Sequence, residues 1–277
     1  MKTKLMFSAA FLTSGFLISS FAGPASMSDY SKEKNPVVEQ QPVCDPRWYI
    51  SIGAGTDFDY QGTDFFNGAR ALAFGGAVLL DINSHTYDSV YNTNFYRIQG
   101  EFGYVLTRHL EVFGMFKYSH ADSEITSGST ATVDLKGPVT FVLTDHWGDY
   151  SAWGGELGLR YFFLPKEARF RPYVSISGGA TAVDDIHLLV VDDTGSTAFD
   201  GALYDSSVVG TVALLVGVEV AVSCHFSVGV DAGVRYETKL DGNDSDLIDQ
   251  GYSTISNVNN AGDRLYCPVT VYGKFRF

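Results

Sequence analysis

The feature that most constrains the fold is a strict period of two that recurs along the chain. In the stretch 48–58, for example, Trp48, Ile50 and Ile52 alternate with Tyr49 and Ser51. Successive side chains of a β-strand point to opposite faces, so the pattern predicts strands with one apolar face. The runs are about 10 to 14 residues long, which suits tilted strands that cross a bilayer. Aromatic residues gather near the run ends, where a membrane-interface girdle would lie.

The connections between the runs predict how many strands cross the membrane. Short connections alternate with long polar segments at 57–93, 120–149, 183–206 and 237–263. Outer-membrane barrels alternate short periplasmic turns with long outside loops. We therefore predict an all-β fold, an eight-stranded antiparallel transmembrane β-barrel with both chain ends in the periplasm. Its strands are expected at 48–58, 94–106, 110–120, 150–163, 169–182, 207–222, 226–237 and 264–277.

A ten-stranded barrel is the alternative, and it depends on two further stretches. "ALAFGGAVLLDI" at 71–82 has the composition of a strand but falls inside the first long segment. Counting it alone gives nine strands and moves the short turns to the wrong side. It is therefore expected to be a hairpin arm above the membrane, unless "VDLKGPVTFVL" at 133–143 joins the barrel as well.

The N-terminus is expected to be a secretory signal peptide. Lys2 and Lys4 precede an apolar run without charge, and small residues such as Ser20 and Ala22 offer a cleavage site. We predict a signal at 1–22, extending to 25 at most, a periplasmic segment at 23–47 and the barrel at 48–277. No segment after the signal has the length and composition of a membrane helix.

Four motifs carry a resemblance to a known class of proteins. They are the signal at 1–25, "WYISIGAG" in the first run, "RPYVSISGGA" at 171–180 and the closing "VYGKFRF". With these motifs the chain resembles the small outer-membrane β-barrels, including the transmembrane domain of outer-membrane protein A and the opacity-type surface antigens. The resemblance implies the outer membrane of a Gram-negative-type bacterium but no particular chemistry.

The last residues resemble the signal that the barrel-assembly machinery recognises in such families. The chain ends on Phe277, and apolar side chains precede it at every second position except Gly273; those expected to form the signal are Phe275, Val271 and Val269. A terminal strand that pairs with the first strand would leave no open sheet edge.

In each predicted strand, the alternate positions that carry polar side chains are expected to face the barrel interior. The interior of an eight-stranded barrel is just wide enough to be filled by side chains. Charges of both signs would therefore neutralise one another there, and an unpaired charge would be costly. The candidate lumen ion-pair residues are Arg97, Glu101, Lys117, Glu156, Arg160, Arg171, Glu219, Asp231, Arg235 and Lys274.

The formal net charge of −13 comes mainly from the four long segments. They are rich in Asp and Glu, and their only bases are Arg70, Lys136 and Lys239. Self-repulsion is expected to keep them mobile and to exclude nucleic acid. Their acids lack the spacing of a metal loop, so no metal site and no cofactor is predicted. Weak bridging by divalent cations to lipopolysaccharide is expected, and a host or surface ligand is a possible partner.

The chain has three cysteines. Cys44 precedes the first strand and Cys224 lies in a short turn, so both are expected on the periplasmic side. A Cys44–Cys224 disulfide is the candidate pairing. Cys267 is expected to face lipid as a small hydrophobe.

The favoured function is a non-enzymatic barrel with a filled lumen and a structural or surface-interaction role, as in adhesins and opacity proteins. A narrow porin-like channel is the alternative. A third possibility is an omptin-like protease, in which Asp185 and His187 would activate water opposite Asp57 and Asp59.

Overall fold

In the computed structural model, the described residues are 46–59, 63–73, 78–91, 95–134, 138–243, 245–249, 252–256 and 262–277. The predicted signal peptide and nearly all of the predicted periplasmic segment lie outside these ranges. None of the helices within them is long and apolar enough to cross a membrane.

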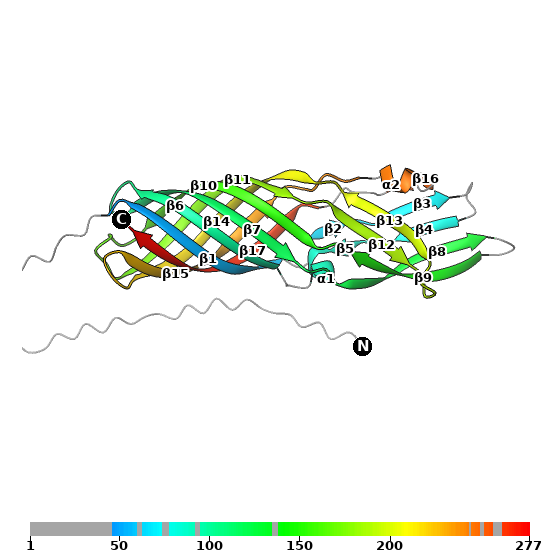
Figure 1. Ribbon diagram of the computed structural model, residues 1–277, viewed down its shortest axis with the longest axis horizontal. Coiled ribbons are helices and arrows are strands. Elements are labelled where there is room, and N and C mark those ends of the chain that lie inside the picture. Colours follow the sequence, from blue (N-terminus) through cyan, green and yellow to red (C-terminus); the bar gives the residue numbers. More distant parts are fainter. Residues whose placement is uncertain are drawn as a thin grey trace, which may run out of the picture. The chain divides into compact units, whose positions relative to one another are not determined.

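Eight long antiparallel strands close into a barrel (Figure 1). Neighbours in the wall follow the order β1-β17-β15-β14-β11-β10-β7-β6, and β6 returns to β1. The strands are β1 (Trp48–Asp59), β6 (Phe95–Val105), β7 (Leu110–Ala121), β10 (Tyr150–Phe162), β11 (Phe170–Val183), β14 (Ser207–Ala221), β15 (Phe226–Glu237) and β17 (Arg264–Arg276). The predicted eight-stranded barrel is confirmed, with strand ends within one residue of those expected.

The barrel closes because its first and last strands pair along their whole length. Tyr49 lies opposite Arg276, and the register continues to Asp59 opposite Tyr266. Beyond the last strand, the Phe277 N–H donates to the Trp48 carbonyl at 2.9 Å, and the Trp48 N–H donates back at 3.2 Å. Every wall strand therefore has two neighbours and no edge is left open.

The long segments at the other end of the barrel fold into a second sheet, which we call the outer sheet. Its order is β13-β12-β9-β8-β4-β3-β16. The strands are β3 (Ala69–Ala73), β4 (Val78–Ile82), β8 (Ile125–Asp134), β9 (Pro138–Trp147), β12 (Ile186–Val191), β13 (Thr197–Tyr204) and β16 (Tyr252–Ser256). Figure 1 shows this sheet beyond the end of the barrel opposite the C-terminus.

Three smaller features accompany the outer sheet without joining it. A two-stranded ladder joins β2 (Asp64–Phe66) to β5 (His85–Thr86), and the helix α1 (Tyr87–Tyr91) follows it. The helix α2 (Ser245–Asp249) contacts both edge strands, β13 and β16. Its Asp246 carboxylate accepts a hydrogen bond from the Ala202 N–H at 2.7 Å, which satisfies a donor on the β13 edge.

The outer sheet corrects two expectations. The described residues of 71–82 belong to the antiparallel pair β3 and β4, as expected of a hairpin arm, and those of 133–143 belong to the pair β8 and β9. Neither stretch joins the barrel wall, so the ten-stranded alternative is wrong. The long segments were also expected to be mobile loops, whereas their described residues form strands around a hydrophobic core. Buried aromatic side chains outweigh the charge repulsion there, because the acids of these segments point mostly to the surface.

The core of the outer sheet is continuous with the top of the barrel. Phe65 lies at its centre, with ring centroids 4.9 to 5.4 Å from those of Tyr87, Tyr91, Trp147 and Tyr204. Inward-facing barrel residues belong to the same cluster, namely Phe95, Ala121, Tyr150, Ala152, Val183 and Val209.

Candidate functional site

The candidate site is the barrel interior, where charged side chains from all eight wall strands meet. The structure places all ten predicted lumen residues there, each at most 6 % exposed. Along each strand they occupy the alternate positions that face the interior, as do the buried residues Tyr49, Tyr173 and Tyr272. These positions also bury charged residues outside the predicted set, described below.

At the C-terminal end of the barrel, two glutamates share three cations. The Lys274 ammonium lies 2.9 Å from Glu111 and 2.8 Å from Glu219. Arg171 lies 3.2 Å from Glu219, and Arg276 pairs with the same carboxylate. The cluster joins four strands across the bore, so it holds the barrel cross-section together at this end.

Arg160 occupies the next level. Its two terminal nitrogens donate to the two Glu101 oxygens at 2.8 and 2.9 Å, a bidentate pair. The guanidinium carbon also lies 4.9 Å from the ring centroids of both Phe113 and Tyr173. Cation–π contacts with two rings, together with the paired carboxylate, compensate for the loss of water around the charge.

Farther along the bore, Lys117 bridges two carboxylates. Its ammonium lies 3.1 Å from Glu156 and 2.8 Å from Glu237. Arg235 adds a contact with Glu156 at 3.1 Å, and the Tyr266 hydroxyl donates to Glu237 at 2.9 Å.

At the outer end of the bore, two aspartates of β1 pair with arginines. Arg97 pairs with Asp57, and Arg264 contacts Asp59 at 2.7 Å while its guanidinium lies 3.5 Å from the Phe95 ring centroid. Both aspartates fall in the segment 57–93, which was expected to be a loop, whereas the structure includes them in β1 with their side chains buried. In β1 every second residue, such as Tyr49 and Ser51, faces the barrel interior, and Asp57 and Asp59 continue that alternation. Extending the alternation beyond Gly55 would have predicted their inward position.

Asp231 departs from the predicted pattern of ion pairs. No described lysine or arginine lies within ion-pair distance of its carboxylate, which accepts a hydrogen bond from the Tyr173 hydroxyl at 2.8 Å. Parity predicts that a side chain faces the lumen, but the partner depends on the stagger of the strands around the barrel.

The lumen charges balance among the described residues. Eight bases face eight acids: Arg97, Lys117, Arg160, Arg171, Arg235, Arg264, Lys274 and Arg276, with Asp57, Asp59, Glu101, Glu111, Glu156, Glu219, Asp231 and Glu237. Above them the aromatic core of the outer sheet covers the end of the bore. Together these buried side chains form a polar core inside the barrel.

The predicted assembly residues lie on the outside of the barrel. Phe277, Phe275 and Val271 are exposed, and Val269 is half-buried on the same face. The Phe275 and Phe277 rings stack at 6.4 Å, which forms an aromatic edge beside the Trp48 backbone. Recognition of these residues by an assembly machinery stays a prediction.

The cysteine pairing also stays a prediction. Cys224 is exposed in the turn between β14 and β15, where it forms no disulfide with a described residue. Cys44 lies outside the described residues. Cys267 is half-buried on the outward parity of β17.

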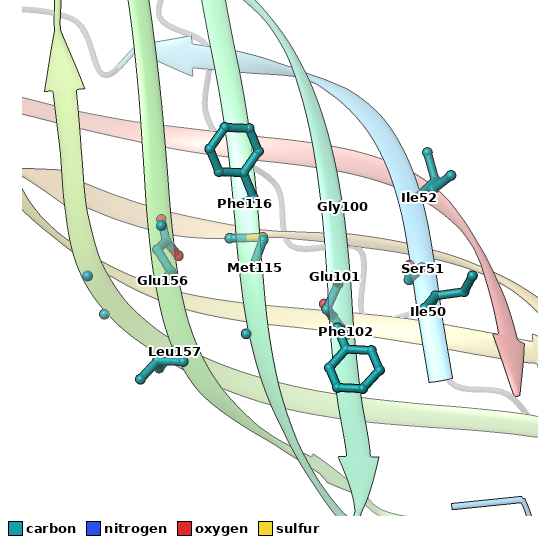
Figure 2. A pocket seen from close by; sticks show the side chains of 14 residues that line it. Ile50, Ser51, Ile52, Gly100, Glu101, Phe102, Met115, Phe116, Glu156 and Leu157 are labelled. Carbon is teal, nitrogen blue, oxygen red and sulfur yellow. The ribbon is translucent and has the colours of Figure 1, made fainter. Parts of the chain in front are cut away.

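A shallow apolar groove of about 860 Å³ runs over the outer surface of the barrel (Figure 2). Ile50, Ile52, Phe102, Phe116 and Leu157 project from the wall around it, and all five are exposed. Its floor contains Gly100 and Gly155, where an added Cβ would meet nothing within 4 Å. Such a surface matches hydrocarbon chains and lacks the convergent polar groups of a site for a soluble substrate.

A buried polar cluster, which no sequence pattern indicates, lies beside the outer sheet. The buried Asp145 carboxylate accepts from the Ser129 hydroxyl at 2.6 Å and lies 3.2 Å from His85 Nε2. The carboxylate lies between the serine and the histidine, so the histidine cannot activate the serine. The cluster ties β5 to β8 and β9.

Comparisons with known proteins give structural matches only. No family model and no curated protein matches the chain. Neisserial surface protein A matches with 15% identity and a TM-score of 0.37, over 83% of this chain and 97% of its own. The attachment invasion locus protein Ail of Yersinia pestis matches with 13% identity and a TM-score of 0.38, over 83% and 99%. The outer membrane protease OmpT from Escherichia coli matches with 11% identity and a TM-score of 0.34, over 83% and 97%.

These solved structures are a surface protein, an attachment protein and an outer membrane protease. At similarities this low, no conclusion about the role of the chain follows from them. The closed eight-stranded barrel is established by the strand pairing of the chain itself.

Proposed function

We propose that the protein is an outer-membrane barrel that carries the outer sheet as a folded structure for surface interaction, and that it is neither a pore nor an enzyme. The observation that carries the proposal is the outer sheet itself, which has its own buried core joined to a filled barrel. A barrel that served only to conduct would have no need of a folded cap across its bore.

The barrel exterior supports a membrane location. Its middle is apolar on every strand, with exposed side chains such as Ile98, Leu157, Leu214 and Val230. Aromatic side chains lie toward both ends, including Trp48 and Tyr161 at one end and Tyr96 and Trp153 at the other. An apolar band between two aromatic girdles matches a bilayer and would cause aggregation in water.

The surface of the outer sheet supports an interaction role outside the cell. Most of its charged side chains are acids, and the exposed bases among the described residues of these segments are Arg70 and Lys239. The exposed acids are Asp64, Asp122, Glu124, Asp149, Asp184, Asp185, Asp193, Asp200, Asp205, Asp241, Asp249 and Asp263. The proposed ligand is therefore cationic, or anionic and bridged by divalent ions as lipopolysaccharide phosphates would be.

The protease alternative has less support. Asp57 and Asp59 are each neutralised by an arginine, as shown above, so neither carboxylate is free to hold an attacking water. His187 and Asp185 do form an exposed pair at 2.8 Å. Exposed pairs of this kind are common on acidic surfaces and carry no catalytic implication by themselves.

Cysteine labelling on intact cells tests the orientation on which the proposal depends. In a variant without native cysteines, Asp193→Cys lies in the exposed turn of the outer sheet, and Lys166→Cys lies in the short turn between β10 and β11. A membrane-impermeant maleimide should label position 193 on intact cells and position 166 only after the outer membrane is opened. Labelling of position 166 alone on intact cells would contradict the proposed orientation and, with it, the surface role.

A further inference from the structure

Three side chains that can bind a metal meet at the outer rim of the barrel. His120 is the second-to-last residue of β7, Asp122 directly follows that strand, and Asp149 lies between β9 and β10. One potential ligand atom from each lies within 4.8 Å of the other two. His120 and Asp122 come from the end of β7 and Asp149 from the β9–β10 connection, and the pairing of β7 with β10 brings them together.

The histidine ring is held in the orientation that a metal ligand needs. Ser151 lies opposite His120 in the strand register, and its hydroxyl oxygen is 2.9 Å from His120 Nδ1. With Nδ1–H donating to that hydroxyl, the lone pair of Nε2 points toward Asp122, whose Oδ1 is 3.4 Å away. A second ring nitrogen fixed by a hydrogen bond is the usual support of a metal-bound histidine. The Tyr96 ring, 5.2 Å away, packs against the imidazole.

The Asp149 carboxylate is oriented independently. Its Oδ1 accepts from the Ser123 N–H at 3.0 Å and lies 3.3 Å from the Ser123 hydroxyl. Its second oxygen is not engaged by these bonds. The residue is exposed, so a metal and its water ligands can reach it.

The charge of the cluster also calls for a cation. Within the described ranges, no lysine or arginine forms an ion pair with Asp122 or Asp149, and His120 is the base that pairs with Asp122. The buried carboxylates of the lumen differ, because nearly all of them have a cationic partner.

We propose that His120, Asp122 and Asp149 bind a divalent metal ion of the zinc class. One imidazole nitrogen with two carboxylate oxygens is a donor set that Zn²⁺ accepts, whereas Ca²⁺ and Mg²⁺ select oxygen donors alone. Three protein ligands leave a coordination position open to water. The ion links the end of β7 to the β9–β10 connection, so it fastens the base of the outer sheet to the barrel wall.

Calorimetric titration of the refolded full-length chain in detergent micelles tests the proposal. The starting protein has all three cysteines replaced by alanine and carries no histidine tag, so that neither can bind the probe, Zn²⁺. One saturable site is expected, and zinc should raise the unfolding temperature because it binds the folded state. His120→Ala and Asp149→Asn should each weaken binding by about tenfold or more. Asp149→Asn keeps an oxygen that can accept from Ser123, so this variant is expected to retain the local fold.

His187→Ala is the matched control, because it removes the imidazole of the other exposed histidine–aspartate pair. It should leave zinc affinity unchanged. Folding of each variant is checked by heat-modifiable gel mobility. If His120→Ala does not fold, the zinc affinity of Asp149→Asn serves as the test. The proposal is overturned if no saturable binding occurs, if neither variant weakens it, or if Ca²⁺ displaces zinc at equal concentration.

Discussion

At the residue scale, close approach of neighbouring strands restricts particular positions to glycine. Gly179 of β11 faces β10, and a Cβ added there would lie 1.9 Å from the Gly155 carbonyl oxygen. Because a backbone atom cannot move aside as a flexible side chain can, the two strands would have to separate.

Gly179→Ala is therefore expected to destabilise the barrel by about 1–3 kcal/mol, the range for overpacking. Gly100→Ala is the matched control, since an added Cβ there meets nothing within 4 Å, and a change within about 0.5 kcal/mol is expected. Urea unfolding in micelles measures both. Equal losses in the two variants would show that the close approach at Gly179 is not the cause.

The buried pair of Arg160 and Glu101 gives a second prediction at this scale. Arg160→Met leaves the Glu101 carboxylate buried without its bidentate partner, and a loss of about 3–5 kcal/mol in the free energy of unfolding is expected. Adding Glu101→Gln removes the uncompensated charge and should restore much of that loss. A double variant no more stable than Arg160→Met would contradict this explanation.

Much of the site at this scale could be predicted from the sequence, because the strand period of two fixes which side chains face the lumen. All ten predicted residues are inside the barrel. Their partners could not be predicted, since contacts across the bore depend on strand stagger rather than on sequence spacing. Asp231, which pairs with a tyrosine, shows the difference.

At the element scale, the eight wall strands could be predicted, but of the outer sheet only the hairpin arm at 71–82 could. The wall strands are long and alternate over their whole length, whereas strands such as β3 and β4 span only five residues each. Short strands between polar residues give a weak periodic signal. Their stability comes from aromatic side chains far apart in the chain, such as Phe65 and Tyr204, and no local pattern reports that contact.

The buried tyrosines of the outer sheet predict its response to alkali. Burial raises the pKa of Tyr87 and Tyr91 well above their usual value. Because the folded protein keeps these hydroxyls protonated, the unfolded chain loses their protons first, from its pKa of about 10 upward. The folded state is therefore fully stable below that pH and loses free energy of unfolding as the pH rises beyond it. The outer sheet should therefore stay folded from neutral pH to about pH 9 and begin to unfold above about pH 10.

Trp147 fluorescence reports this transition once Trp48 and Trp153 are replaced by phenylalanine, because Trp147 packs against Phe65 in the same core. Tyr87→Phe removes one of the titrating hydroxyls and its hydrogen bond to the Gly262 carbonyl. Between neutral and alkaline pH, the Trp147 fluorescence of this variant should change less than that of the protein with Tyr87. An identical pH profile in both proteins would exclude Tyr87 as a source of the effect.

The paired backbone of the outer sheet predicts a restricted pattern of proteolysis. On intact cells, proteinase K should cut exposed turns such as 192–196 before it cuts β8, β9 or β12, because those strands are hydrogen-bonded to neighbours. Mass spectrometry of the released peptides locates the cuts. Rapid cleavage inside β9 and β12 would instead support mobile loops at the barrel end.

At the scale of the whole molecule, the charges are separated by environment. The lumen holds equal numbers of acids and bases among the described residues, and the acidic excess lies on the outer sheet. Ion pairs link strands across the bore, and the aromatic core covers its outer end. This separation of charge is what we expect if, as proposed, the barrel is sealed and supports an acidic surface structure.

Conductance of the refolded protein in planar lipid bilayers tests the sealed barrel most directly. Ions would have to break the pairs that join Lys117, Arg160 and Lys274 to their glutamates, and then pass the core around Phe65. We expect no steady openings at moderate voltage, with at most rare, brief events. Steady ohmic steps from the wild-type protein would contradict a sealed lumen and favour a channel.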